Sequence, residues 1–232
     1  MKGAFITATG TGVGKTWLTS ALSRACVARG LRVASIKPME TGVDPEPLDA
    51  IELARACRQP ALARAEGLYR ASPPLAPYAV ERAGGPAIGS LERLAERTRE
   101  LGADADCLLV EGAGGVLVPL DAKKTIADFA SILGLPILLV AENALGVLSY
   151  TLTAVEALGA RGLEVQAIAL QQIRGHDAED ISPSSNAAVL ANYLHGIPIV
   201  SLPQVRSISE LIEPASELCE ILDFQRRDAP SR

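Results

Sequence analysis

Short runs rich in valine, isoleucine and leucine alternate along the chain with longer amphipathic stretches. Continuous apolar runs are typical of strands buried on both faces of a parallel sheet, and amphipathic stretches are typical of the helices that cover such a sheet. The runs predict strands at about Gly3–Ala8, Arg32–Lys37, Cys107–Glu111, Ile137–Ala141, Val165–Gln171 and Ile197–Ser201. The stretches predict helices at about Lys15–Arg29, Leu48–Cys57, Ser90–Leu101, Thr125–Leu133, Val147–Ala160, Ser184–Leu194 and Ser207–Leu222. The alternation predicts an α/β fold with a mostly parallel sheet and helices on both of its faces.

One segment does not fit this alternation. Residues Ala71–Gly89 contain four prolines and form a connection too long for an ordinary link between a strand and a helix. Long ordered loops are often functional, so the segment is a candidate lid or wall over a site, and an idle surface excursion is the alternative.

Length and composition favour a single domain. The chain has 232 residues, of which 48% are hydrophobic, enough to bury one large core. We expect this domain to cover residues 1–223, followed by a polar tail over residues 224–232.

The formal net charge is −5, so no basic field attracts nucleic acid, and a small anionic ligand held by a local site is the better expectation. No run approaches the roughly 18 apolar residues that span a bilayer, so no membrane partner is predicted. Four cysteines without a C-x-x-C pair indicate reduced thiols and a cytoplasmic location.

A glycine-rich run follows the first predicted strand. The sequence ITATGTGVGKTWL ends its loop in Gly14, Lys15 and Thr16, as a phosphate-binding loop does, although Thr9 stands where the usual pattern has its first glycine. Such a loop turns backbone N–H groups toward a polyphosphate at the start of a helix, and supplies a lysine for the phosphates and a hydroxyl for Mg²⁺.

Two alternatives compete with a nucleotide site at this loop. A glycine turn could contain Gly-Lys-Thr by chance, but the strand and the helix occur in the required order. A dinucleotide-binding turn is disfavoured because its glycine spacing does not match here.

Two further predicted strands end in charged residues. Glu111 ends an apolar strand and precedes a glycine turn, where a carboxylate could bind a nucleotide-bound Mg²⁺. Lys37 ends another strand and could neutralise charge on a transferred phosphoryl group, and Asp49 follows at a predicted helix start. The alternatives are a polar residue opening a turn for Glu111, a solvated side chain for Lys37 and a helix N-cap for Asp49.

The order of these motifs resembles the dethiobiotin synthetase family. TGTGVGKT, KPMETG, the helix start at Asp49, LVEGAGGVLVPL and ALGVLSYTLTAVEALGARGL occur in that order, and the resemblance extends from about Ala4 to Leu202. It implies a phosphate-loop NTPase-like fold and an ATP-dependent enzyme that closes the ureido ring of dethiobiotin from 7,8-diaminononanoate and CO2. Positioning and charge neutralisation would carry such a reaction.

The resemblance also implies roles for individual residues. Thr11, Lys15 and Lys37 would contact the phosphates and the carbamate, Thr41 would contact the diamine, and Thr16, Asp49 and Glu111 would bind Mg²⁺. ATP would be held by Gly12, Val13, Gly14, Lys15, Thr16, Asp49, Glu111, Gly112, Ala113, Gly114, Gln171 and Pro203. The substrate carboxylate would lie at a helix N-terminus of the neighbouring subunit, formed by Gly146, Val147, Leu148 and Ser149, which implies a homodimer with shared sites.

The sequence departs from the family at a few of these positions. Ala8 and Gly10 replace a glycine and an aspartate of the family's loop, Gln171 replaces the asparagine that reads adenine, and Ser149-Tyr150 replace Asn-His. Gln171 keeps the amide of asparagine but reaches one methylene further.

Two other functions are compatible with a phosphate-loop fold. A related amidoligase is disfavoured because the chain has no room for a glutaminase domain. A partitioning ATPase that switches on a membrane or on DNA is disfavoured because the loop has no second lysine and the chain has no basic tail.

Overall fold

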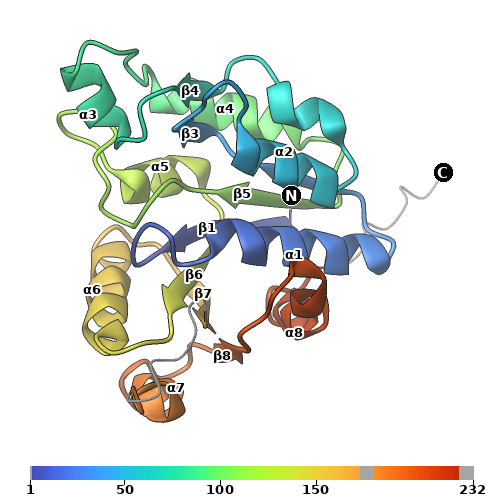
Figure 1. Cartoon of the computed structure of the whole chain (residues 1–232), viewed down its shortest axis with the longest axis vertical. Helices are drawn as coiled ribbons and strands as arrows, with labels where there is room; N and C mark the ends of the chain where they lie inside the picture. The colour runs from blue at the N-terminus through green and yellow to red at the C-terminus, as the bar shows by residue number, and fades with distance from the viewer. Residues whose placement is uncertain (1, 173–179, 225–232) are drawn as a thin grey trace.

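The computed structural model describes residues 2–172 and 180–224 (Figure 1). Its main element is a parallel six-stranded sheet with the strand order β2-β5-β1-β6-β7-β8. The strands of this sheet are β1 (Lys2–Ala8), β2 (Val33–Ile36), β5 (Cys107–Glu111), β6 (Ile137–Glu142), β7 (Val165–Gln171) and β8 (Ile199–Leu202). A second, two-stranded parallel sheet pairs β3 (Met39–Thr41) with β4 (Tyr69–Ala71).

Helices connect the strands and cover both faces of the main sheet. They are α1 (Lys15–Ala28), α2 (Leu48–Ala56), the 3₁₀ helix η1 (Pro60–Arg64), α3 (Pro77–Arg82), α4 (Leu91–Leu101), α5 (Ile126–Leu133), α6 (Val147–Gly159), α7 (Pro183–Tyr193) and α8 (Ile208–Ile221). Helix α1 packs against α2 and α8, and α4 packs against α5. The β1–α1–β2 and β5–α5–β6 connections run in opposite directions across the sheet, and right-handed crossovers therefore place these helices on opposite faces.

The predicted α/β architecture is confirmed, and the predicted element boundaries are close to those observed. The bounds of β5 and β7 are as predicted, and the other predicted elements differ by one or two residues at an end. The strands of the main sheet read clearly from sequence because their residues are buried on both faces; β5, for example, is buried throughout. Helix α8 continues through Pro214, as the predicted range Ser207–Leu222 requires.

The sequence analysis missed β3, β4, η1 and α3. The first three lie between Lys37 and Ala71, where the predicted pattern held only a helix. Helix α3 lies inside the proline-rich segment Ala71–Gly89, whose Val80 is fully buried and whose Tyr78 N–H donates to the carbonyl of Pro119. None of the residues that line the two cavities described below comes from this segment.

Close packing at the centre of the sheet brings two strand ends together. A β-carbon at Gly3 would lie 2.3 Å from the carbonyl oxygen of Leu108, so glycine is what allows β1 to lie against β5. The register then pairs Ile6 with Glu111. The carboxyl ends of β1 and β5 therefore meet at the edge where parallel sheets bind ligands.

The core extends to the end of the described chain. Phe224, which the sequence analysis assigned to the tail, is 5% exposed and packs in the core. The rest of the predicted tail, residues 225–232, lies outside the described residues. All four cysteines are buried free thiols.

Candidate active site

The glycine-rich loop connects the end of β1 to the start of α1. Gly12 has φ 76° and Gly14 has φ 89°, and this left-handed region costs little energy only for glycine. A β-carbon at Gly14 would also lie 2.7 Å from the Oε1 atom of Gln171. The loop thus ends at the N-terminus of α1 in the arrangement that binds phosphates.

Lys15 begins α1 and is 6% exposed. Its Nζ atom donates a hydrogen bond of 3.1 Å to the carbonyl of Gly10, so the side chain folds back over the loop. Burial is the largest influence on its pKa and lowers it to about 8, although Glu111 acts in the opposite direction. An anionic ligand beside Nζ would raise this pKa again, because it would stabilise the charged form.

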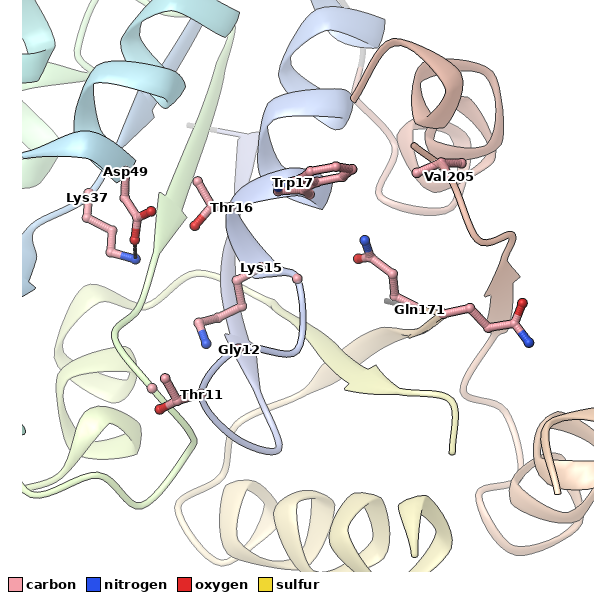
Figure 2. Close-up of a pocket in the computed structure, with 12 residues that line it drawn as sticks. Thr11, Gly12, Lys15, Thr16, Trp17, Lys37, Asp49, Gln171 and Val205 are labelled. Atoms are coloured by element: carbon pink, nitrogen blue, oxygen red, sulfur yellow. Dashed lines mark hydrogen bonds and ion pairs between the residues drawn. The ribbon is translucent and has the colours of Figure 1, made fainter. Parts of the chain in front are cut away.

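Lys37 lies between two carboxylates at the floor of the site. Its Nζ atom is 2.5 Å from Oε1 of Glu111 and 2.8 Å from Oδ2 of Asp49. The hydroxyl of Thr16 donates to the same Oε1 atom of Glu111 at 2.8 Å. Figure 2 shows Lys37 and Asp49 beside Thr16 at one side of the cavity, with Lys15 and Thr11 along the loop. Lys37, which follows β2, and Glu111, which ends β5, therefore meet at the same edge of the sheet, as expected from the sequence.

The charges of this cluster stabilise one another. Burial is the largest influence on Lys37 and opposes its charged form, but Glu111 and Asp49 outweigh it and raise the pKa of the lysine above its usual range. Burial likewise opposes ionisation of Asp49, yet Lys37 lowers the pKa of this aspartate. Lys37 is therefore an ammonium at neutral pH, held between the carboxylates of Glu111 and Asp49.

The same cluster has the composition of a Mg²⁺ site. Glu111 is fully buried, and its second oxygen, Oε2, has no hydrogen-bond partner among the described residues. The hydroxyl of Thr16 and the carboxylate of Asp49 lie beside it, and hard cations prefer oxygen ligands of these kinds. The residues present thus fit a divalent cation bound together with a phosphate.

Glu40, in β3, fixes the start of α2 and was missed by the sequence analysis. Its Oε1 atom accepts from the N–H of Asp49 at 2.9 Å and its Oε2 atom accepts from the N–H of Ala50 at 3.1 Å. Pro47, at the N-cap position, makes no side-chain cap hydrogen bond. Asp49 is itself a helical residue whose side chain turns to Lys37, so the alternative that Asp49 caps the helix is wrong. Glu40 is therefore a remote cap that orients Asp49.

We expect Glu40→Ala to raise the Mg²⁺ concentration needed for half-maximal ATP turnover severalfold, because Asp49 loses its support. Loss of the cap should also lower the free energy of unfolding by about 1 kcal/mol. Mg²⁺ titrations at saturating ATP and thermal unfolding measure the two effects. Ser90→Ala is the matched control, because Ser90 caps α4 through the N–H of Arg93. An equal change in Mg²⁺ requirement in both variants would contradict the positioning role.

A cavity of about 400 Å³ opens above the loop and the carboxylate cluster. It is lined by Thr11, Gly12, Gly14, Lys15, Thr16, Trp17, Lys37, Asp49, Gly114, Gln171, Gln172 and Val205. Most of the predicted ATP and phosphate residues therefore share one space. Trp17, Gln172 and Val205 were not predicted.

Other predicted ATP-binding residues lie near the cavity without lining it. The side chain of Val13 is buried in the core, and Gly112 packs so closely that a β-carbon would lie 3.0 Å from the ring of Phe5. Ala113 is half-buried against the core. Pro203 follows β8 and is exposed, and it is Val205 on the same segment that reaches the cavity.

A second cavity, of about 550 Å³, lies between the glycine-rich loop, residues 115–119 and α6. Thr11 lines both cavities, and Ser149 lines only this one. The remaining predicted substrate residues do not line either cavity. Thr41 is the last residue of β3, and Gly146 is the exposed N-cap of α6. Val147 is buried and Leu148 is half-buried against the core. The predicted substrate residues thus do not gather around one space within one copy of the chain.

Known proteins resemble this chain over most of its length. Residues 2–211 match the protein family described as an AAA domain. The ATP-dependent dethiobiotin synthetase of Anaeromyxobacter dehalogenans is 44% identical over 204 residues, which make up 88% of this chain and 90% of that protein. The enzyme of the same name from Caulobacter vibrioides is 39% identical over 211 residues, covering 88% of this chain and 93% of that protein.

Two solved structures that resemble this one have much lower sequence identity. The cell division ATPase MinD of Pyrococcus furiosus superposes with a TM-score of 0.60 at 18% identity, covering 96% of this chain and 99% of that chain. The MinC:MinD complex of Aquifex aeolicus gives a TM-score of 0.58 at 15% identity, covering 100% and 99%. These similarities establish the fold alone. Within the described residues, the helices are too short or too polar to cross a membrane.

Family membership rests on the sequence relatives. Their identity extends over most of both chains. The AAA-domain match over residues 2–211 contains the glycine-rich loop, Lys37, Asp49 and Glu111. The chain therefore belongs to the dethiobiotin synthetase family.

Proposed function

We propose that this protein catalyses the ATP-dependent carboxylation and ring closure of 7,8-diaminononanoate to dethiobiotin. The convergence of Lys15, Lys37 and the Thr16–Glu111 pair beside one phosphate loop is the observation that carries the proposal. The names of the relatives supply the substrate.

The proposed reaction has three steps. One amine of the substrate adds to CO2 and loses a proton, giving a carbamate. A carbamate oxygen then attacks the γ-phosphorus of ATP, the bond to the bridging oxygen of ADP breaks, and a carbamic–phosphoric anhydride forms. Finally the second amine attacks the carbamate carbon and expels phosphate, which closes the ureido ring with loss of a proton. Phosphorylation is needed because a carbamate alone has no good leaving group.

In this scheme the protein positions the reactants and neutralises charge. Lys15 and the N–H groups of the loop hold the phosphates, and Lys37 places a permanent positive charge where the phosphoryl group is transferred. Thr11 contributes a hydroxyl from the part of the loop that borders both cavities. It can therefore contact the phosphate and the carbamate from one position.

Thr16, Asp49 and Glu111 would hold Mg²⁺ beside the phosphates. The bound ion would supply charge neutralisation at the phosphate oxygens. Glu111 is suited to this role because its Oε2 atom is buried without a partner among the described residues.

The proposal includes a homodimer. The second cavity borders Ser149 and the exposed side chains of Leu117 and Tyr150, and Leu145, which precedes α6 in the chain, is 83% exposed. A second copy would cover these apolar groups, because exposed apolar patches of this kind mark interaction surfaces. It would also bring the N-terminus of its own α6, from Gly146 to Ser149, to the carboxylate of a substrate whose amines lie near Thr11 and Thr41.

The test is an assay with 7,8-diaminononanoate, bicarbonate, Mg²⁺ and ATP. We expect phosphate to be released in a one-to-one ratio with dethiobiotin identified by mass spectrometry. The control omits the diamine. Phosphate release that does not depend on the diamine would refute the proposal and leave only an ATPase of the same fold.

A further inference from the structure

The cavity above the phosphate loop has two chemically different ends. Lys37 and Asp49 lie at one end, and Trp17, Val205 and Gln171 lie toward the other (Figure 2). Figure 2 shows Trp17 on the first turn of α1 and Val205 on the segment before α8, and both residues line the same cavity as Lys15. The charged end suits phosphates, and the other end offers apolar surface and amides.

Trp17 stands out among the lining residues. It is the only tryptophan of a chain whose aromatic content is 3%, and it is 40% exposed. Each buried aromatic side chain removes a large apolar area from water, so an indole left half in solvent at a cavity wall has surface available for a ligand. It directly follows Thr16, whose hydroxyl lies at the phosphate end. Because Trp17 and Thr16 line the same cavity, the indole lies within reach of a nucleoside whose phosphates are held by the loop.

We propose that Trp17 forms the wall on which the nucleobase of ATP stacks, with Val205 on the other side and the amides of Gln171 and Gln172 at the base edge. The proposal rests on the proposed nucleotide site and adds the source of its affinity for the base. Gln171 is 2% exposed, and its Oε1 atom has no partner among the described residues, so this acceptor is open to a donor on the ligand. Stacking tolerates any base, and the amides supply the selectivity.

The single tryptophan makes the test direct. Excitation at the red edge of the absorption band reports on Trp17 alone, because the chain has no other tryptophan. We expect Mg²⁺–ATP to quench this emission, and inorganic tripolyphosphate to bind in competition with ATP without quenching it. If calorimetry shows that ATP binds while the emission of Trp17 stays unchanged, the proposal is overturned.

Affinities of variants separate the base from the phosphates. Trp17→Ala should weaken ATP binding about tenfold, equivalent to about 1.4 kcal/mol. The same change should leave the affinity for tripolyphosphate within about twofold, and Trp17→Phe should restore most of the ATP affinity because phenylalanine also stacks. Equal losses for ATP and tripolyphosphate, or no recovery in Trp17→Phe, would overturn the proposal. Unchanged melting temperatures confirm that both variants fold.

The outcomes also separate this proposal from the proposed function. If the wild-type protein makes dethiobiotin and Trp17→Ala binds ATP normally, only the stacking role is refuted. ATP binding that depends on Trp17, in a protein that makes no dethiobiotin, would refute the proposed reaction and keep the base site.

Discussion

Lys37→Ala is expected to lower kcat by about 10²–10³-fold while changing the dissociation constant of ATP by less than about threefold. Its ammonium is already paired with the carboxylates of Asp49 and Glu111, so we expect it to contribute little to holding ATP. Its charge matters most when the phosphoryl group transfers and negative charge spreads over its oxygens. Single-turnover phosphate release and calorimetric ATP binding measure the two quantities separately.

Folding has to be controlled in this experiment, because removing the lysine leaves Glu111 buried without its cation. Lys37→Gln is the second variant, since its amide can still donate to a carboxylate but carries no charge. Lys124→Ala is the matched control, because Lys124 forms an exposed ion pair with Glu92. Parallel losses of ATP affinity and turnover in a folded variant would contradict the assigned role.

Glu111→Gln is expected to lower turnover by about 100-fold or more and to raise the Mg²⁺ requirement. Glutamine keeps the shape of the side chain but replaces one carboxylate oxygen by an amide nitrogen, which cannot bind a cation. The Oε1 atom of Glu111 also accepts hydrogen bonds from Thr16 and Lys37, so the substitution removes a charge shared by two other proposed site residues. Titrating Mg²⁺ at saturating ATP measures the shift.

Glu100→Gln is the control for this substitution, because Glu100 is an exposed carboxylate on α4 paired with Arg97. It should change neither the Mg²⁺ requirement nor the rate. A Glu111→Gln enzyme with normal Mg²⁺ dependence would show that Asp49 and Thr16 suffice for the metal, and would remove Glu111 from the proposed ligand set.

The main sheet was predictable because each of its strands carries its own signal. A strand buried on both faces is a continuous apolar run whatever its neighbours are, as in Cys107–Glu111. Strands β3 and β4 are three residues each and contain charged residues such as Glu40 and Arg70. Their pairing joins segments about thirty positions apart through the register Glu40 with Arg70, which no local pattern contains.

The residues of the candidate site also fall into two groups: those that a sequence pattern predicts and those that only tertiary contacts bring to the site. Lys15 and Thr16 belong to a local motif, and Lys37 and Glu111 could be placed together because both end parallel strands. Glu40 was missed because its role is to cap a helix nine residues away. Trp17 was also missed, because in sequence it is one apolar residue at a helix start. Only the folded chain brings it together with Val205 to line the cavity.

Because Lys37 pairs with both carboxylates of the site, we expect the chain to fold without bound metal or nucleotide. In zinc fingers and many other small metal-binding domains, the ion itself holds the ligands together, and the domain unfolds without it. Here the ammonium of Lys37 already offsets the repulsion between Asp49 and Glu111. The acidic floor therefore has its counter-charge within the chain itself, and we expect release of a nucleotide in each catalytic cycle to leave the two carboxylates in place for the next one.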